Sequence, residues 1–600
     1  MNESTDTSLL VTDYVVVVGF FVVMVAIGFY FAGRMRNVKD YFAGGNRVPW
    51  WLSGISYWMS SFSAFAFVAH SALAYRHGFV PVTFWWMSTL AIIVAAWLVA
   101  ARWRRVATTS PMEFVEKRYS KEVRQVLAWL ISVLIILDDA TKIMAVGTVI
   151  AVSMNYSARD VILWCGLIML FYTLLGGLWA VLVTDTVQFF VLLASVFVLV
   201  PLALNRVNGF GGFVENAPEG FFAFAGGKYT VWYLVAFGIL ILMTYGTRWS
   251  LVQRFYSVPT DADARKVGYL AAGLCVFVAP WMLFPAMAAS VFMPGIEDPD
   301  QVYGLVCREM LPAGMLGMLI ASIFSATMSS LSSDYNAVAS VLTTDVYKRL
   351  FNRDGTERHY VLVGRAMTLL VGSLTIGSAL FLSTLSKDLL LFDIMVAIFA
   401  LLGPPTALPI LAGLLFRRVS NAGAICGMIV GVGVSAVARF MWLPIAGAIN
   451  SILVAVNFSE ITVQNIPETG LMFIGMFSTI GGMILGSLLW PGSPQVRQSV
   501  REFLSGLSEK EKTRLPEMQD SSGISPMPIV GLALAALAVV LLISTLATVP
   551  VRESTCSLVV GACMLTVGAG LALLPRLLMS VSENISGPQD NTIVEERQND

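Results

Sequence analysis

Apolar runs of roughly 18–25 residues, the length that crosses a bilayer, recur along the chain between residues 13 and 576. Short polar stretches separate these runs, so the pattern predicts an all-α polytopic membrane protein with about fifteen transmembrane helices. The predicted spans are 13–33, 50–75, 79–101, 123–152, 159–176, 178–204, 229–249, 267–293, 314–345, 360–383, 388–415, 421–442, 468–490, 527–549 and 555–575.

Polar sequence separates the last two predicted spans from the others. Segment 491–526 contains PGSP and alternating charges such as SEKEKTR, which predicts a partly helical cytoplasmic linker. The polar tail 577–600 is predicted to be disordered. Segment 443–466 holds an apolar run, SILVAVNF, that is too short to span, which favours an outer loop with an interfacial helix.

Arginine and lysine gather on one side of the predicted spans. They follow the first, third, ninth and eleventh spans, whereas the opposite loops hold few basic residues. The basic side contains Arg34, Arg36, Lys39, Arg47, Arg102, Arg104, Arg105, Lys117, Arg118, Lys121, Arg124, Lys348, Arg349, Arg353, Arg417 and Arg418. Because basic loops stay in the cytoplasm, the N-terminus is predicted outside and the C-terminus inside.

Composition agrees with the spans and argues against other classes. The chain is 57% hydrophobic and 13% charged, as expected for a polytopic membrane protein. No basic domain exists to bind nucleic acid, and the six cysteines and three histidines show no disulfide or metal-ligand spacing. No nucleophile–base arrangement or phosphate-binding glycine loop stands out, so neither an enzyme nor an organic cofactor is expected. The acidic leader lacks a basic region, which predicts that the first span is retained.

One predicted span carries an unusual patch of oxygen-bearing side chains. Residues 325–334 read SATMSSLSSD, which places several hydroxyls and one carboxylate in apolar surroundings. On a helix, Ala326, Ser329, Ser330 and Ser333 share one face, with Ser332 beside it. Hydroxyl and carbonyl oxygens without histidine or cysteine suit a hard monovalent cation. The patch therefore predicts a sodium site and sodium-coupled movement of a small solute.

Small and polar residues interrupt two predicted spans. The first interruption is GISYWMSSFSAF at 54–65 and the second is MTYGT at 243–247. They lie at corresponding points of two five-helix halves, which is typical of broken helices around a site at the middle of the membrane. Unwound backbone leaves carbonyls free to hold a cation. Helix packing through small residues is the alternative interpretation.

Charged residues inside predicted spans are further candidates. Asp185 lies within the sixth span, where a carboxylate marks either a functional site or a structural hydrogen bond. Asp138, Asp139 and Lys142 lie in the fourth span, and their spacing of three and four allows an internal ion pair, contact with a charged substrate being the alternative. Asp393, near the start of the eleventh span, could face the outer interface.

Five stretches together resemble the sodium:solute symporter family, the group that contains sodium–glucose, sodium–proline and sialic acid transporters. They are DYFAGGNRVPWW (40–51), LLGGLWAVLVTDTVQFF (174–190), WSLVQRFYSVPTDADARKVG (249–268), SATMSSLSSDYNAVASVLTTDVYKR (325–349) and LLGPPTALPILAGLLFRR (401–418). The resemblance implies a LeuT-like fold of two inverted five-helix repeats with extra flanking helices. The implied divisions are 1–49 (leader and first helix), 50–204 (first repeat), 205–228 (outer loop), 229–418 (second repeat), 419–490 (additional helices), 491–526 (linker), 527–576 (two C-terminal helices) and 577–600 (tail).

The same resemblance implies site residues. Sodium site 1 would use the carbonyls of Met59, Phe62 and Ala326 with the hydroxyls of Ser329 and Ser330. Sodium site 2 would use Asp185, Ser332 and Ser333 and share Ser329, so two sodium ions are expected. Thr244 or Tyr245 lies where sugar-carrying relatives have an aromatic inner gate. The implied substrate site contains Ser60, Ser63, Phe67, Asp139, Lys142, Thr244, Tyr245 and Asp393.

The sequence leaves the substrate open. The eleventh span lacks the polar set of the sugar and proline subgroups, and the fourth adds the DDATK cluster. The expectation is therefore a small polar organic solute: a sugar, sugar acid, amino acid or carboxylate. Two other functions are the alternatives. A sodium-permeable channel would need a repeated filter motif, and a solute sensor would carry a signalling domain after the last helix. We expect a monomeric transporter in a plasma membrane, the bacterial inner membrane.

Overall fold

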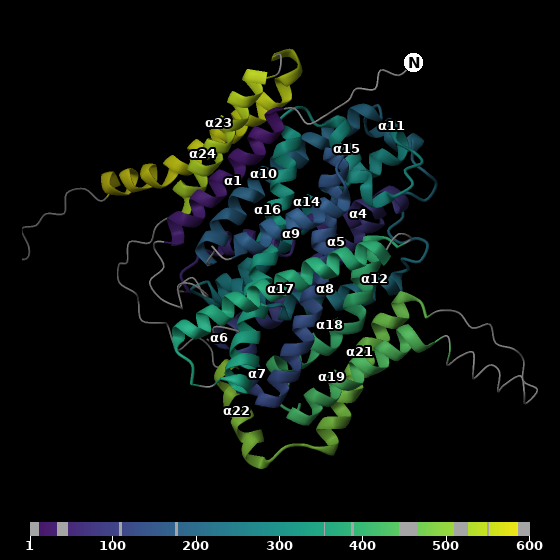
Figure 1. The fold of residues 1–600 in the computed structure, drawn as a ribbon, viewed down its shortest axis with the longest axis vertical. Coiled ribbons are helices and arrows are strands. Elements are labelled where there is room, and N and C mark those ends of the chain that lie inside the picture. Colours follow the sequence, from purple (N-terminus) through teal and green to yellow (C-terminus); the bar gives the residue numbers. More distant parts are fainter. Residues whose placement is uncertain are drawn as a thin grey trace, which may run out of the picture.

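The structure is a computed structural model that describes residues 11–32, 46–106, 111–173, 178–352, 354–385, 389–442, 444, 466–508, 526–548 and 551–585. Within these ranges it is helical, with one isolated β-bridge between Gly226 and Tyr229 (Figure 1). Most of the predicted interfacial segment 443–466, residues 509–525 of the predicted linker and the tail beyond residue 585 lie outside the described residues.

The helices follow the chain in three groups. The first group is α1 (Val11–Ala32), α3 (Trp50–Ser60), α4 (Ala64–His77), α5 (Val80–Ala95), the π-helical turn η2 (Ala96–Ala100), α6 (Ala101–Val106), α7 (Pro111–Arg118), α8 (Lys121–Met154), α9 (Ala158–Thr173), α10 (Leu178–Arg206) and α11 (Gly209–Asn216). The second is α12 (Val231–Thr247), α13 (Trp249–Tyr256), α14 (Asp261–Phe292), η3 (Pro299–Gln301), α15 (Val302–Met310), α16 (Met315–Val341), η4 (Leu342–Phe351), α17 (Glu357–Leu385) and α18 (Leu391–Leu415). The third is α19 (Asn421–Ala436), η5 (Val437–Met441), α21 (Glu468–Leu489), α22 (Pro494–Ser508), α23 (Pro526–Thr548) and α24 (Val551–Ile585).

Fewer helices than the predicted fifteen satisfy the demands of a bilayer. In the described part of the chain, 11 helices are long and apolar enough to cross, or up to 13 if each of two bent pairs is one span. Helix α9 has only 16 residues, and α8 carries Asp138, Asp139 and Lys142 in its middle, so neither is in that count. Each predicted span nevertheless coincides with a helix or a bent pair, and α24 continues past the predicted boundary at residue 576 to Ile585.

Both predicted interruptions are breaks between helices. Helices α3 and α4 meet at a bend of 58°, and α12 and α13 meet at a bend of 56°. At the first break, the Ser63 hydroxyl accepts a hydrogen bond from the Phe65 N–H and so begins α4. The second break falls at Arg248, whose backbone is extended, one residue after the predicted MTYGT segment. Bends of this size are what the broken-helix interpretation predicts.

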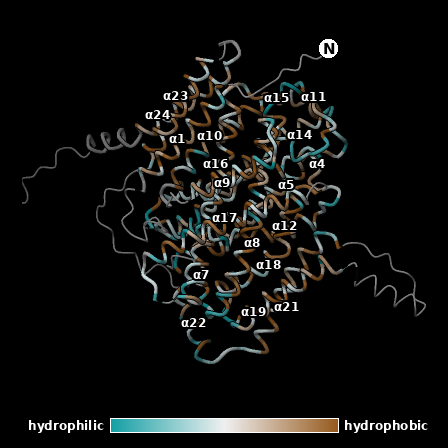
Figure 2. Tube along the Cα trace, viewed as in Figure 1, coloured by the Kyte–Doolittle hydropathy of each residue, from teal (hydrophilic) through white to brown (hydrophobic). Residues whose placement is uncertain are grey.

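Helix α16 lies at the centre of the packing. It contacts α8, α9, α10, α17 and α1, and the whole of its most apolar stretch is buried. Helices α1, α23 and α24 lie together along one side, and α19 packs against α21 at the other end (Figure 1). Hydrophobic sequence covers the long helices, whereas hydrophilic sequence gathers near α11, α15 and α22 (Figure 2). In a helical membrane transporter, apolar residues are expected on the surface that faces lipid and polar residues in the interior of the bundle.

Helix α1 holds the first turn of α16. The Asp13 carboxylate accepts hydrogen bonds of 2.8 Å from the N–H groups of both Gly314 and Gly317. A carboxylate at a helix N-terminus satisfies free N–H groups and interacts favourably with the helix dipole. A Cβ at Gly317 would lie 2.4 Å from the Asp13 carbonyl oxygen, so this close approach requires glycine.

Candidate ion and solute site

The first break lies directly against the hydroxyl patch of α16. The N–H of Ala64, the first residue of α4, donates a 2.9 Å hydrogen bond to the Thr327 hydroxyl. Met59 and Phe62 are buried on the α3 side of the break, where the Phe62 N–H donates to the Met59 carbonyl at 3.2 Å. This places the carbonyl end of α3 beside the stretch that contains Ala326.

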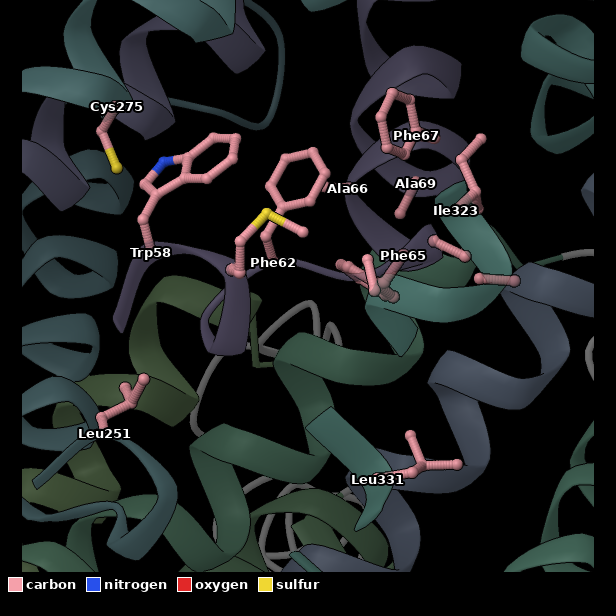
Figure 3. Close-up of a cluster of buried hydrophobic side chains, with 14 of the residues drawn as sticks. Trp58, Phe62, Phe65, Ala66, Phe67, Ala69, Leu251, Cys275, Ile323 and Leu331 are labelled. Atoms are coloured by element: carbon pink, nitrogen blue, oxygen red, sulfur yellow. The ribbon is translucent and has the colours of Figure 1, made fainter. Parts of the chain in front are cut away.

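Aromatic side chains pack around this break. Phe62 stacks on Trp58 with ring centroids 4.6 Å apart and meets Phe67 edge-on at 5.1 Å. Figure 3 shows these rings beside the break, with Ile323 of α16 near Phe67 and with Leu331 farther from the rings. Such packing excludes water, which strengthens the interaction of any ion with the oxygens inside.

The carboxylate of Asp185 joins three helices. Its two oxygens each accept a 2.5 Å hydrogen bond, one from the Ser329 hydroxyl and one from the Ser56 hydroxyl. The Arg254 guanidinium lies 3.7 Å from Asp185 and donates to Ser56 at 3.2 Å. The Ser332 hydroxyl donates to the Ser329 carbonyl at 3.0 Å. Of the residues predicted for sodium site 2, the structure therefore joins Asp185 to Ser329, Ser332 contacts Ser329 within α16, and Ser333 is partly exposed.

Five buried or nearly buried ionic side chains, here named the charged cluster, lie next to this region: Asp138, Asp139, Lys142, Arg248 and Asp334. Lys142 Nζ lies 2.6 Å from Asp139, 3.1 Å from Asp138 and 3.2 Å from Asp334. Arg248 lies 2.6 Å from Asp138 and 2.5 Å from Asp334. The predicted pairing within α8 is present, and it extends to Asp334 of α16 and to Arg248 at the second break. With all five side chains ionised, three carboxylates face two cations, which leaves the charged cluster with one excess negative charge.

A cavity of about 120 Å³, here named the central cavity, opens between the break and the charged cluster. Of the residues predicted to bind substrate, Ser60, Ser63, Lys142, Thr244 and Tyr245 line it. The sodium-site residues Phe62 and Ser330 also line it, as do Asp138 and Arg248. A second cavity of about 60 Å³ shares Asp138, Thr244 and Arg248 and reaches Met112 of α7.

Three residues predicted for the substrate site do not line the central cavity. Phe67 packs against Phe62 and Tyr303, and Asp139 is wholly buried behind Lys142. Asp393 forms a 2.7 Å ion pair with Lys228 in the loop before α12. Asp393, in the first turn of α18, is therefore paired with a loop residue and does not line the central cavity.

Sequence reasoning did not single out several polar residues of the site. Arg248 directly follows MTYGT, the second predicted interruption. Asp334 is the last residue of SATMSSLSSD, the predicted sodium-binding patch. His70 and Trp85 line the central cavity together with the predicted residue Ser60. Their atoms His70 Nδ1, Trp85 Nε1 and Ser60 Oγ are buried and have no hydrogen-bond partner among the described residues. Buried polar atoms without partners are costly, which favours a ligand that completes them.

A helical membrane bundle with two broken helices, an oxygen-rich helix and a polar central cavity defines a membrane transporter. The Sodium:solute symporter family model matches residues 41–431, which is well over half of the chain. The chain belongs to the sodium:solute symporter family, a family of transporters without enzymatic activity.

Relatives within the family differ in the solutes that they carry. The chain is 25% identical over 525 residues to the sodium/sialic acid symporter NanT of Aliivibrio fischeri, covering 84% of this chain and 97% of the relative. It is 26% identical over 447 residues to the sodium/glucose cotransporter of Vibrio parahaemolyticus, covering 68% and 81%. It is 25% identical over 471 residues to the human sodium-coupled monocarboxylate transporter 1, covering 74% of each.

A solved structure shares the fold. The structure of a Na⁺-coupled sialic acid symporter in a substrate-bound outward-open state superposes with a TM-score of 0.66 at 20% identity, covering 80% of this chain and 98% of that one. The protein is therefore an all-helical, multi-pass membrane protein with the fold of that symporter.

Proposed function

We propose that this protein couples the inward movement of sodium to the uptake of a small polar organic solute by alternating access. The observation that carries the proposal is the position of Ser330, which lies on the predicted sodium-binding face of α16 and also lines the central cavity. An ion and a solute bound there would be neighbours, so each would favour the conformation that binds the other.

Two sodium ions bind in this proposal. Site 1 is formed by the carbonyls of Met59, Phe62 and Ala326 with the hydroxyls of Ser329 and Ser330. Site 2 is formed by Asp185 with Ser329, Ser332 and Ser333. The hydrogen bond from Ala64 to Thr327 supports site 1, because it holds the break against α16. The hydrogen bond from Ser329 to Asp185 supports site 2.

Charge balance favours a solute with one carboxylate. The charged cluster has one excess negative charge, and Asp185 is paired with Arg254. Two sodium ions would leave one excess positive charge in a poorly hydrated site, and a monoanionic solute removes it. Among the sugars, sugar acids, amino acids and carboxylates considered from the sequence, sugar acids and simple carboxylates fit best. Ser60, His70 and Trp85 would bind the polar groups of the solute.

The proposed arrangement in the membrane follows the predicted repeats. Helices α3 to α10 form one repeat and α12 to α18 the inverted one, with α1 and the helices after α18 outside them. About fifteen segments cross the bilayer in this proposal. The end that carries α6, α7 and α22 faces the cytoplasm, because its loops are basic. The monomer works in a plasma membrane, that of a bacterium.

Transport into proteoliposomes tests this function. Labelled sialic acid, glucose and a monocarboxylate are offered with an inward sodium gradient and with choline in place of sodium. We expect sodium-dependent, saturable uptake of a carboxylate-bearing solute, and loss of its sodium dependence in Ser330→Ala. The matched control is Ser322→Ala, because the hydroxyl of this buried serine of α16 donates to the Leu319 carbonyl and has no other partner among the described residues. Sodium flux that needs no solute would instead identify a channel.

A further inference from the structure

Lys142 shares an oxygen with the proposed sodium site. Its ammonium donates a 3.0 Å hydrogen bond to the hydroxyl oxygen of Ser330, and both side chains are buried and line the central cavity. We propose that Lys142 and a sodium ion compete for this hydroxyl, so that Lys142 couples sodium binding to solute binding. The inference rests on the proposed function, because it takes Ser330 as a sodium ligand.

Competition follows from the charges on the two groups. A sodium ion coordinated by Ser330 would lie on the same oxygen as the ammonium, and two cations so close in a poorly hydrated site repel strongly. The ammonium can leave Ser330 without losing its other partners, because Asp138, Asp139 and Asp334 all lie within 3.2 Å of it. Sodium binding therefore changes which groups Lys142 contacts and leaves it inside the charged cluster.

The same exchange reaches the solute. Lys142 and Ser330 both line the central cavity. When the ammonium turns away from Ser330, the N–H group that bonded Ser330 can therefore point into the cavity. An anionic solute in the cavity attracts the ammonium and thereby frees the Ser330 oxygen for sodium. By linkage, sodium raises solute affinity by the factor by which solute raises sodium affinity. Lys142 is thus a positioning residue for sodium and a contact for the solute.

A test must separate competition at Ser330 from a general change of charge. Two double variants keep the net charge of the charged cluster: Asp138→Asn with Lys142→Gln, and Asp138→Asn with Arg248→Gln. Only the first removes the cation on Ser330, because Arg248 bonds to carboxylates of the cluster. The purified full-length proteins are compared by equilibrium binding of ²²Na⁺ in choline buffer, with no solute present.

We expect the variant without Lys142 to bind sodium about 5-fold or more tightly than both the unmodified protein and the variant without Arg248, which keeps the ammonium on Ser330. Equal affinities of the two double variants, or weaker binding without Lys142, would overturn the inference. The variant Ser330→Ala distinguishes failure of this inference from failure of the proposed function. If Ser330→Ala leaves sodium affinity unchanged, the proposed ion site itself is wrong.

A second measurement needs no substitution and so does not depend on the variants folding. Structures of the unmodified protein are determined in sodium buffer and in choline buffer. With sodium bound at Ser330, we expect Lys142 Nζ to lie beyond hydrogen-bond distance of the Ser330 hydroxyl. An unchanged Lys142–Ser330 hydrogen bond beside a bound sodium ion would overturn the inference.

Discussion

Asp185 on α10 and Ser329 on α16 are 144 residues apart in the sequence and are joined by a 2.5 Å hydrogen bond. Ser329 also lies one residue from Ser330, which faces the central cavity. A carboxylate buried without any exposure thus reaches the helix on which both proposed ion sites depend. In the proposed arrangement of two sites, substitution of Asp185 alone would therefore change the number of sodium ions bound.

Asp185→Asn should reduce the stoichiometry from two sodium ions to one. The amide keeps a hydrogen-bond acceptor but loses the charge that neutralises a second cation. Sodium activation of uptake should be sigmoidal in the unmodified protein, with a Hill coefficient that falls toward one in the variant. The ratio of ²²Na⁺ to solute flux in proteoliposomes measures this directly. Ser56→Ala, which removes the other hydroxyl on Asp185, is the control and should keep the ratio of two. A ratio of one in the unmodified protein would leave Asp185 with a structural role.

Ser329→Ala and Ser330→Ala should each weaken sodium activation. Removing one oxygen ligand leaves the ion undercoordinated, which costs on the order of 1–3 kcal/mol, or roughly 5- to 150-fold in affinity. The sodium concentration for half-maximal uptake measures the change. Sodium activation that is the same in both variants as in the unmodified protein would remove these serines from the ion site.

Arg248→Gln should strongly destabilise the protein. The substitution leaves three buried carboxylates facing Lys142 alone, and breaking a buried ionic network costs on the order of 3–5 kcal/mol. Thermal unfolding of the purified protein measures the effect. Adding Asp138→Asn should recover part of the loss, because it removes one of the unpaired charges.

A surface pair provides the comparison for Arg248. Arg206 lies 3.2 Å from Glu309, and the two side chains are 51% and 40% exposed. Arg206→Gln should therefore change stability by less than about 1 kcal/mol. If both arginine variants unfolded at the same temperature, the charged cluster would have no special role in stability.

The stability of the protein should depend on pH through Asp300, in the loop before α15. Burial raises the pKa of this carboxyl to about 7, although the N–H of Leu391, which donates to it at 2.9 Å, favours the charged form. The folded protein therefore keeps a proton that the unfolded chain has lost above about pH 4. This contribution is present at acid pH and disappears as the pH rises from about 4 to 7, by at most about 1.4 kcal/mol per pH unit.

Asp300→Asn should flatten that dependence. Unfolding temperatures of the unmodified protein and the variant, measured between pH 4.5 and 8, give the comparison. The exposed Asp160 supplies the control, because Asp160→Asn should leave the slope unchanged. Parallel curves for Asp300→Asn and the unmodified protein would show that another group titrates in this window.

The sequence predicted the positions of the helices well because the bilayer fixes the length of each apolar run. It also predicted the serine face of α16 and the first break, since both are local patterns within one helix. The role of Arg248 could not be predicted in the same way. Its partners Asp138 and Asp334 come from α8 and α16, and only the packed bundle brings the three together.

Two other misses have the same origin. His70 and Trp85 are ordinary members of apolar stretches in the sequence, and their unpartnered nitrogens become informative only when both line one cavity. The family resemblance implied that Asp393 lies near the solute, whereas its position near the start of a predicted span allowed it to face the outer interface. Its ion pair with Lys228 depends on a loop whose path the span pattern does not specify.

The Asp13 carboxylate attaches the first turn of α16 to α1, which restricts the movements open to that helix. Two N–H groups held by one carboxylate prevent the helix from sliding along its axis relative to α1, whereas tilting about the held end preserves both hydrogen bonds. Ser329 lies about 22 Å along the helix from Gly314, at 1.5 Å per residue. A tilt of α16 by a few degrees about its first turn would therefore displace Ser329 and Ser330 perpendicular to the helix axis. Helix α1 contributes no residue to the proposed sites, yet any tilt of α16 that keeps these two hydrogen bonds would turn about the point where α1 holds it.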